Sequence, residues 1–221
     1  MEALHQSPKY KAWRRLLSKN GTVVTDATLL AAIPKGNTDE ILFAFLKLKA
    51  QSNQGRPFPS SVLIRGHAVV IIPIVIEKVT KKPYVILVNQ LRSATGGLML
   101  ELPAGMLDRQ VHDPLKVALR EFEEEVGLSL GKTRLKRVNS EPLFTSPGLL
   151  DEGIYYFYFE KTLPKKQILA LNHQVRGCVE ENEHITVCCM PLEKAFPLVH
   201  SIPALYGLSW YALNRLKRLR S

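Results

Sequence analysis

Hydrophobic residues gather along this chain in short runs that are separated by polar stretches rich in Pro, Gly and Lys. Runs of this length, with many Val, Ile, Leu and aromatic residues, are typical of β-strands. We therefore expect strands over six segments: 41–50, 62–76, 84–92, 98–102, 153–160 and 184–190. The short sequences "TKK" and "ATGG" are expected to form turns between the earlier strands.

Helical patterns are fewer, and one of them is strongly marked. Asp113 is a good N-cap, Pro114 suits the first helical position, and Gly127 ends the apolar periodicity. A shorter helix is expected around 13–17, and one or two helices, interrupted near Pro203, over 192–219. Strands, one clear helix and terminal helices together predict a mixed sheet with helices packed on it.

A polar stretch, "QSNQGRPFPSS" at 51–61, follows the first expected strand and reads as a linker or long loop. We place a domain boundary there. The division predicts an N-terminal segment over 1–60 and a main domain over 61–221.

Composition limits the class of protein. The 221 residues are 46% hydrophobic, which is enough for a sizeable core. The longest apolar run, 68–76, is far shorter than the ~20 residues of a membrane-spanning helix. The N-terminus lacks the pattern of a secretion signal, although its Lys and Arg content leaves a mitochondrial alternative open. Cys178, Cys188 and Cys189 form no C-x-x-C pair, so we read them as core or surface thiols and expect a cytoplasmic protein.

The formal charge of +10 predicts attraction to anions such as phosphates, nucleic acid or acidic membranes. Part of this charge lies in the last turns, "NRLKRLRS". Cations there also complement the dipole of a C-terminal helix, so nucleic-acid binding is not the only explanation.

The stretch "REFEEEVGL" at 120–128 concentrates four glutamates in the expected helix. At about 100° per residue, a helix here has one apolar stripe facing the core: Leu115, Ala118, Leu119, Phe122 and Val126. Glu121 and Glu125 then share one flank with Glu124 beside them, whereas Glu123 falls on the opposite flank. This spacing suits a Mg²⁺ ion held by one or two carboxylates and by substrate phosphates. A solvated face is the alternative reading.

The same stretch, together with "ELPAGMLD" at 101–108, resembles the Nudix box. The second half matches at Arg120, Glu121, Glu124, Glu125 and Gly127, whereas the first half departs from the pattern. Fourteen residues, one more than the pattern has, separate Gly105 from Arg120, and the first family glutamate falls on Val111 or His112. A one-residue insertion before the helix is the simplest explanation, with His112 as a metal ligand the less favoured alternative.

Other stretches resemble the ADP-ribose and ADP-sugar pyrophosphatase branch of this superfamily: "GHAVVIIP" at 66–73, "NQLR" at 89–92, "TSPGLLDE" at 145–152 and "ENEHITV" at 181–187. The resemblance implies an α/β fold, a Nudix-type α/β/α sandwich with a mixed sheet, plus a small N-terminal β-containing segment. It also implies hydrolysis of an ADP-sugar to AMP and a sugar phosphate with Mg²⁺, or Mn²⁺, as the cofactor. By the same resemblance we expect a homodimer whose N-terminal segment helps complete the site, with no membrane partner.

The resemblance assigns metal ligands and catalytic groups. It implies that Glu121, Glu125, the Ala104 carbonyl and Glu183 hold the metal. From its place beside Glu124 on the helix, Arg120 is expected to orient a carboxylate instead of touching substrate. Glu124 shares a metal or orients one. Glu181 matches the position of the general base, and its neighbour Glu180 is the alternative. The non-functional explanation of this stretch is an acidic surface turn.

Substrate contacts are expected from other segments. Arg92 suits a phosphate because its planar fork binds bidentately, although a plain surface arginine is equally consistent. Pro147 and Gly148 are expected to shape a loop that faces the sugar or adenosine. Trp13 and Phe45 are candidates for stacking from the N-terminal segment of a partner subunit, although we favour core packing for both.

Two competing functions remain open at this level. A Nudix enzyme acting on RNA 5′ ends would use the positive charge. A catalytically weak phosphate- or RNA-binding subunit would explain the incomplete box.

Overall fold

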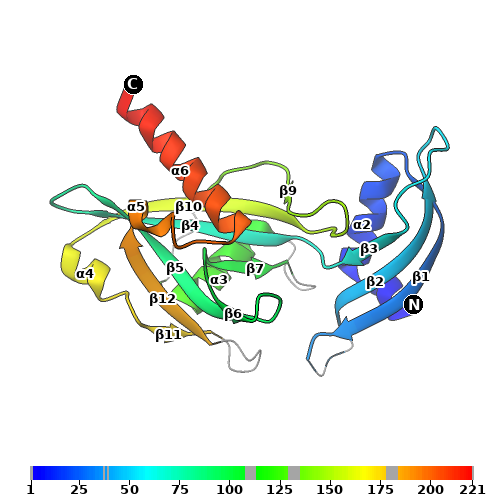
Figure 1. The fold of residues 1–221 in the computed structure, drawn as a ribbon, viewed down its shortest axis with the longest axis horizontal. Helices are drawn as coiled ribbons and strands as arrows, with labels where there is room; N and C mark the ends of the chain where they lie inside the picture. Colours follow the sequence, from blue (N-terminus) through cyan, green and yellow to red (C-terminus); the bar gives the residue numbers. More distant parts are fainter. Residues whose placement is uncertain are drawn as a thin grey trace. The chain divides into compact units, whose positions relative to one another are not determined.

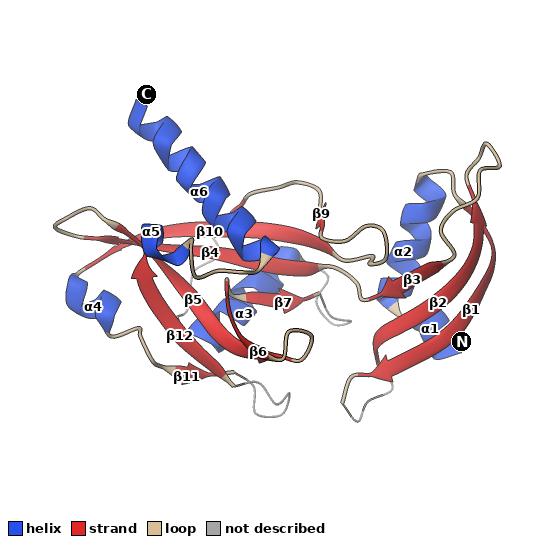
Figure 2. Cartoon of the chain, in the orientation of Figure 1, coloured by secondary structure: helices blue, strands red, loops and turns tan. Residues whose placement is uncertain are grey.

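The computed structural model describes residues 2–36, 38, 40–107, 113–128, 135–177 and 184–220. The helices, blue in Figure 2, are α1 (Glu2–Gln6), α2 (Pro8–Lys19), α3 (Pro114–Val126), α4 (Lys165–Leu169), α5 (Leu192–Ala195) and α6 (Ile202–Arg220). The first six strands are β1 (Val23–Pro34), β2 (Ile41–Gln51), β3 (Ser61–Ile64), β4 (Ala68–Glu77), β5 (Pro83–Arg92) and β6 (Gly97–Glu101). The others are β7 (Ala104–Met106), β8 (Lys136–Arg137), β9 (Leu143–Phe144), β10 (Gly153–Leu163), β11 (Val175–Arg176) and β12 (Ile185–Pro191).

The chain divides into two compact units. The first comprises Met1–Ala68, Met106–His112 and Pro142–Ile154. The second comprises Val69–Gly105, Asp113–Glu141 and Tyr155–Ser221.

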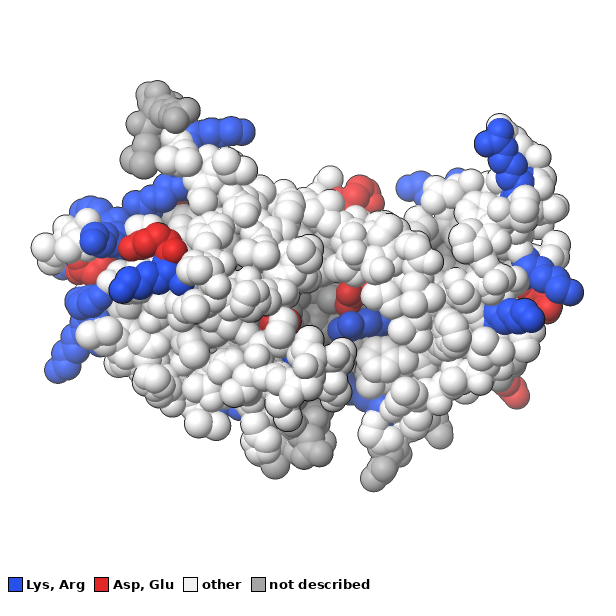
Figure 3. Space-filling model, viewed as in Figure 1, with Lys and Arg blue, Asp and Glu red and all other residues white. Residues whose placement is uncertain are grey.

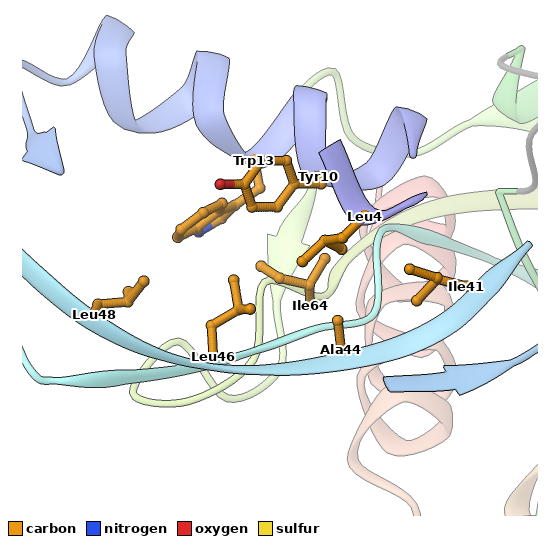
Figure 4. Packing of buried hydrophobic residues seen from close by; sticks show 8 residues of the cluster. All are labelled: Leu4, Tyr10, Trp13, Ile41, Ala44, Leu46, Leu48 and Ile64. Atoms are coloured by element: carbon orange, nitrogen blue, oxygen red, sulfur yellow. The ribbon is translucent and has the colours of Figure 1, made fainter. Parts of the chain in front are cut away.

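The first unit contains an antiparallel sheet in the order β1-β2-β3. Helices α1 and α2 cover one face of this sheet, and Figure 4 shows the core between them. Its eight buried residues are Leu4, Tyr10, Trp13, Ile41, Ala44, Leu46, Leu48 and Ile64. The alternating members of β2 point into this core because successive strand residues face opposite sides. Trp13 is therefore a packing residue, and Phe45, on the other face of β2, is half-buried.

The main sheet has the order β11-β12-β5-β4-β10-β8, with β6 added to β5, β7 to β4 and β9 to β10. Most of it belongs to the second unit, whereas β9 and the first two residues of β10 belong to the first. Central strands β4 and β5 are buried on both faces, which explains their nearly continuous apolar sequences. Figure 1 shows α6 on the near side of this sheet and α3 on the far side. Gly207 lets α6 approach closely, since a Cβ there would lie 2.5 Å from a methyl carbon of Leu102. The predicted mixed α/β fold with a small N-terminal sheet is confirmed.

The expected strand over 62–76 is two strands, β3 and β4. Gly66 has a φ of 83°, in the left-handed region that favours glycine. The backbone amides of Arg65 and Gly66 donate to the Asp151 carboxylate, at 2.6 and 2.9 Å, instead of to a neighbouring strand. The single long run therefore breaks at a polar contact that the apolar pattern hides.

Two other expectations concern helices and thiols. Within the part of the chain that the structure describes, no helix is both long and apolar enough to cross a membrane. Cys189 is a core thiol whose burial raises its pKa to about 12, and Cys188 is half-buried. Cys178 lies outside the described residues.

Candidate active site

The helix that carries the candidate carboxylates begins and ends where the sequence predicts. The Asp113 side chain accepts a hydrogen bond from the Leu115 amide at 3.0 Å, and Pro114 is the first helical residue. Gly127 ends the helix with a φ of 73°, and its amide donates to the Glu123 carbonyl at 2.9 Å. Both ends of α3 are thus fixed by local chemistry, which sets the register of its glutamates.

The buried face of α3 is rotated from the predicted stripe. Val117, Ala118, Phe122 and Val126 are buried, whereas Leu115 and Leu119 are only partly so. Phe122 meets Phe159 of β10 edge-on, with ring centroids 5.0 Å apart.

Glu125 lies on this buried face and is only 4% exposed. The expectation that it sits beside the core, outside the apolar stripe, is therefore wrong. A buried carboxylate needs polar partners. The Ala104 amide supplies one, donating to Glu125 Oε2 at 3.1 Å.

Glu121 packs against Gly105, the residue that follows Ala104. A Cβ built on Gly105 would lie 2.1 Å from the Glu121 carboxyl carbon, so only glycine leaves room for this carboxylate. The two carboxylates predicted to share one flank of α3 thus lie against two consecutive backbone positions, Ala104 and Gly105.

Arg120 holds the outer side of this cluster. Its Nη2 donates to Glu121 Oε1 at 2.8 Å, and its Nε lies 4.0 Å from Glu124 Oε2. Glu124 has 54% of its side chain exposed, and Glu123 is exposed as well. The guanidinium therefore touches carboxylates, in a position suited to orienting Glu121.

The donor set fits a hard divalent cation shared with a substrate. Carboxylate oxygens are the ligands that Mg²⁺ prefers, and Mg²⁺ in phosphate-cleaving sites commonly uses only one or two of them. Among the residues that the structure describes, no group of three or more His, Cys, Asp or Glu side chains is placed to hold a metal by itself. Glu121 and Glu125 match the sparse set that leaves ligand positions for substrate phosphates.

Arg92 has a neighbour that the sequence reading did not single out. Its Nε donates to Glu101 Oε2 at 2.8 Å, and its Nη2 lies 2.8 Å from the same oxygen. Gln90 Nε2 donates to that oxygen at 3.3 Å. Gln90, Arg92 and Glu101 fall on one face of the β5–β6 hairpin, and the register that brings them together comes from the structure.

Pro147 and Gly148 lie in the first unit, in an exposed turn closed by bonds from the Leu149 and Leu150 amides to the Ser146 carbonyl. The residues after this turn are fixed by buried charge. Besides the Asp151 contacts given above, Glu152 pairs with Arg65 Nε at 3.0 Å and accepts a bond from Thr145 at 2.9 Å.

Burial raises the pKa of the Asp151 carboxyl, and the hydrogen bonds from the Arg65 and Gly66 amides oppose this shift. These contacts hold the residues that follow the turn, while its tip, with Pro147 and Gly148, is exposed.

Several predicted residues fall outside the described part of the chain: Val111, His112, Glu180, Glu181 and Glu183. The general base and the additional metal ligand therefore remain predictions. The same holds for the Ala104 carbonyl as a ligand, since the contact seen at Ala104 is made by its amide.

Comparison with known proteins decides the family. The model of the NUDIX domain matches residues 65–209, which is well over half of the chain. This chain belongs to the Nudix hydrolase family. Its carboxylate helix α3 and the segment before it lie inside the matched region.

The chain is similar to several individual proteins. The Nudix hydrolase is 29% identical over 228 residues to the chloroplastic Nudix hydrolase 14 of Arabidopsis thaliana, covering 97% of this chain and 73% of that protein. It is 32% identical over 139 residues to an ADP-ribose pyrophosphatase of Bacillus subtilis strain 168, covering 63% of this chain and 68% of that protein. A crystal structure described as an ADP compounds hydrolase superposes with a TM-score of 0.62, covering 90% of this chain and 95% of that one. At 17% identity, this last likeness concerns the fold alone.

Proposed function

We propose that this Nudix hydrolase cleaves the diphosphate of an ADP-sugar, of the ADP-ribose or ADP-glucose type, into AMP and a sugar phosphate. The observation that carries the proposal is the placement of Glu121 and Glu125 against Ala104 and Gly105, with Arg120 beside them. The name of the relative from Bacillus subtilis supports the substrate class.

The reaction joins the oxygen of water to one phosphorus and breaks the P–O bond to the other phosphate. The two protons of water pass to the two phosphate products, which release most of them at neutral pH because the second pKa of a phosphate monoester is about 6. Glu121 and Glu125 would hold Mg²⁺, with the Ala104 carbonyl and Glu183 as further ligands. A bound Mg²⁺ supplies charge neutralisation on the phosphates and acidifies water. Mn²⁺ has the same preference for oxygen donors and is the alternative ion.

The remaining groups bind and move protons. Arg120 keeps the Glu121 carboxylate in place, and Glu124 lies at the exposed edge of the cluster, where it shares or orients a metal. Glu181 takes the proton of the attacking water, with Glu180 as the neighbour that replaces it if the register is off by one. Arg92 donates to a substrate phosphate, and the turn with Pro147 and Gly148 contacts the sugar or adenosine.

The proposal includes an assembly and two domains. Residues 1–60 act as the dimerisation segment of a homodimer, and 61–221 form the Nudix hydrolase domain. The core that this segment forms, in which seven of the eight buried residues come from 1–60 and Ile64 comes from β3, supports a separate role for it.

One observation favours a second candidate, a Nudix enzyme acting on RNA 5′ ends. The net charge of +10 would attract RNA. On the face drawn in Figure 3, acidic side chains lie among the basic ones. The ADP-sugar reading is preferred because of the name of the relative from Bacillus subtilis. A catalytically weak subunit remains a further outcome, because the box departs from its pattern at Val111 and His112.

A substrate panel tests the proposal. The purified protein is incubated with Mg²⁺ and ADP-ribose, ADP-glucose, UDP-glucose or triphosphate-ended RNA, and AMP or phosphate release is measured. We expect AMP from an ADP-sugar. Turnover of RNA without turnover of ADP-sugars would reject the proposal, and binding without any turnover would favour the weak-subunit reading.

A further inference from the structure

The hairpin of β5 and β6 carries a small polar network on one face. Its antiparallel register pairs Val88 with Glu101, Gln90 with Met99 and Arg92 with Gly97. Side chains of Gln90, Arg92 and Glu101 therefore project from the same face. One oxygen, Glu101 Oε2, accepts from Arg92 Nε at 2.8 Å and from Gln90 Nε2 at 3.3 Å, and Arg92 Nη2 lies 2.8 Å from it in an ion pair.

Burial distinguishes the partners in this network. Gln90 is 6% exposed and the Glu101 side chain 17%, whereas the Arg92 side chain is 43% exposed. Glu101 is thus the interior anchor, and Arg92 is the group that reaches toward solvent. The Arg92 carbonyl also accepts from the Gly96 amide at 2.9 Å, which fixes the backbone at the end of β5.

The geometry leaves half of the guanidinium available. Arginine has five N–H donors in a planar fork. The hydrogen bond and the ion-pair contact with Glu101 use the side edge, formed by Nε and Nη2. The end edge, formed by Nη1 and the second hydrogen of Nη2, makes no hydrogen bond with any residue that the structure describes, and this edge can bind two phosphate oxygens at once.

Glu101 is also connected to the carboxylate cluster of Glu121 and Glu125 through the backbone. Three residues after Glu101, the Ala104 amide donates to Glu125 at 3.1 Å. Between them, the Pro103 carbonyl accepts from the Ile71 amide of β4 at 2.8 Å, which holds the connecting segment on the sheet. A shift of Glu101 would therefore disturb both Arg92 and the loop that faces Glu125.

We propose that Glu101 is a positioning residue, which holds Arg92 by its side edge so that the end edge is ready for the diphosphate of the substrate. This inference rests on the proposed function, because it assigns Arg92 to that substrate. Arginine loses considerable rotamer freedom when it binds an anion. An arginine already tied to a buried carboxylate has lost part of that freedom before substrate arrives, which strengthens binding.

Glu101 could also have the opposite effect on phosphate binding, and this makes the inference testable. If Glu101 merely neutralised Arg92, it would compete with the phosphate, and its removal would tighten binding. The change Glu101→Gln keeps the size of the side chain but removes its charge. We expect it to raise the KM for ADP-ribose and the Kd for ADP roughly tenfold, as for loss of one charge-assisted contact, with kcat within about threefold.

A double-mutant cycle separates positioning from general destabilisation. Arg92→Ala should weaken ADP binding more than Glu101→Gln does, and the double variant should equal Arg92→Ala alone, because Glu101 acts through Arg92. Glu160→Gln is a matched control, since Glu160 Oε2 pairs with Arg218 at 2.9 Å elsewhere in the second unit. It should leave KM and Kd unchanged. If Glu101→Gln does not fold, Glu101→Asp keeps the charge, withdraws the carboxylate by one methylene, and should raise the same KM and Kd.

Each outcome decides the inference. Unchanged or tighter ADP binding in the Glu101 variants, or additive effects in the double variant, would overturn it even if the wild type cleaves ADP-ribose. A wild type that binds ADP with the expected coupling but cleaves no ADP-sugar would leave the inference standing and reject the proposed function. A wild type that binds no ADP would overturn the inference as well.

Discussion

Replacing Gly105 by alanine probes the contact on which the candidate site depends. Gly105 is not in the left-handed region of φ, so its backbone tolerates an L side chain. Space is the only obstacle. The new methyl group would lie 2.1 Å from the Glu121 carboxyl carbon and 2.4 Å from Oε1, so the carboxylate must move away.

The structural cost of this movement is small. Forcing Glu121 off its rotamer costs about 0.5–1.5 kcal/mol. Loss of its partly exposed ion pair with Arg120 adds about 0–1 kcal/mol. Alanine returns about 0.4–1 kcal/mol by restricting the unfolded chain. We therefore expect the free energy of unfolding to fall by less than about 2 kcal/mol.

The functional cost should be much larger. A displacement of about 1 Å in a reacting group can cost about 10²-fold in rate, and the methyl group displaces a proposed metal ligand by at least that much. The assay is ADP-ribose hydrolysis at increasing Mg²⁺, alongside urea unfolding. We expect kcat/KM to fall about 10²-fold or more, and the Mg²⁺ requirement to rise.

Gly97→Ala is the matched control, because Gly97 lies in the same unit and a Cβ there has nothing within 4 Å. It should retain both activity and stability. Normal activity and an unchanged Mg²⁺ requirement in Gly105→Ala would refute the role of Glu121. Extensive unfolding of that variant would instead show that Gly105 and Glu121 form a packing contact needed for the fold.

Three further predictions come from substitutions of the glutamates themselves. Glu121→Gln and Glu125→Gln should each lower kcat at least about 10²-fold while urea unfolding stays cooperative, since a Gln amide oxygen can still accept from Ala104; collapse of either fold would mean a purely structural pair. Glu181→Gln should lower kcat by about 10²- to 10⁴-fold with unchanged Mg²⁺ affinity in a metal titration, whereas Glu183→Gln should weaken that affinity; full activity in Glu181→Gln and loss in Glu180→Gln would move the base by one residue. The Thr80 and Val79 donors lower the pKa of Glu77 from 4.5 to about 2, so its stabilising effect should be complete above pH 4.5 and disappear as the pH falls toward 2. Urea midpoints between pH 3 and 6 should therefore depend less on pH in Glu77→Gln than in the wild type or in the exposed control Glu193→Gln, and equal slopes would contradict this.

Helix α3 could be predicted from the sequence because its determinants are local. Asp113, Pro114 and Gly127 act within a turn of where they stand, and the apolar periodicity fixes the core side to within a small rotation. That rotation mattered at Glu125, whose burial depends on an amide from a distant loop, Ala104. The apolar periodicity of the helix does not reveal a hydrogen-bond partner that is distant in the sequence.

Long-range pairing explains what the sequence did not reveal. Strand β1, Val23–Pro34, has a mostly exposed surface and mixes polar with apolar residues, so its pairing with β2 has no clear period. The break between β3 and β4 depends on Asp151, which lies more than eighty residues away. Likewise, Glu101 acquires its place beside Arg92 only through the register of β5 and β6.

The proposal that Glu121 and Glu125 hold a metal for ADP-sugar hydrolysis is tested most directly by one measurement. It is AMP formation from ADP-ribose by the wild type and by the double variant Glu121→Gln/Glu125→Gln. Each protein is assayed with Mg²⁺, after chelation, and after Mg²⁺ is restored. We predict that the wild type forms AMP, stops on chelation and recovers with Mg²⁺, while the folded double variant forms none. AMP formation that survives chelation, or that persists in the double variant, would contradict the account.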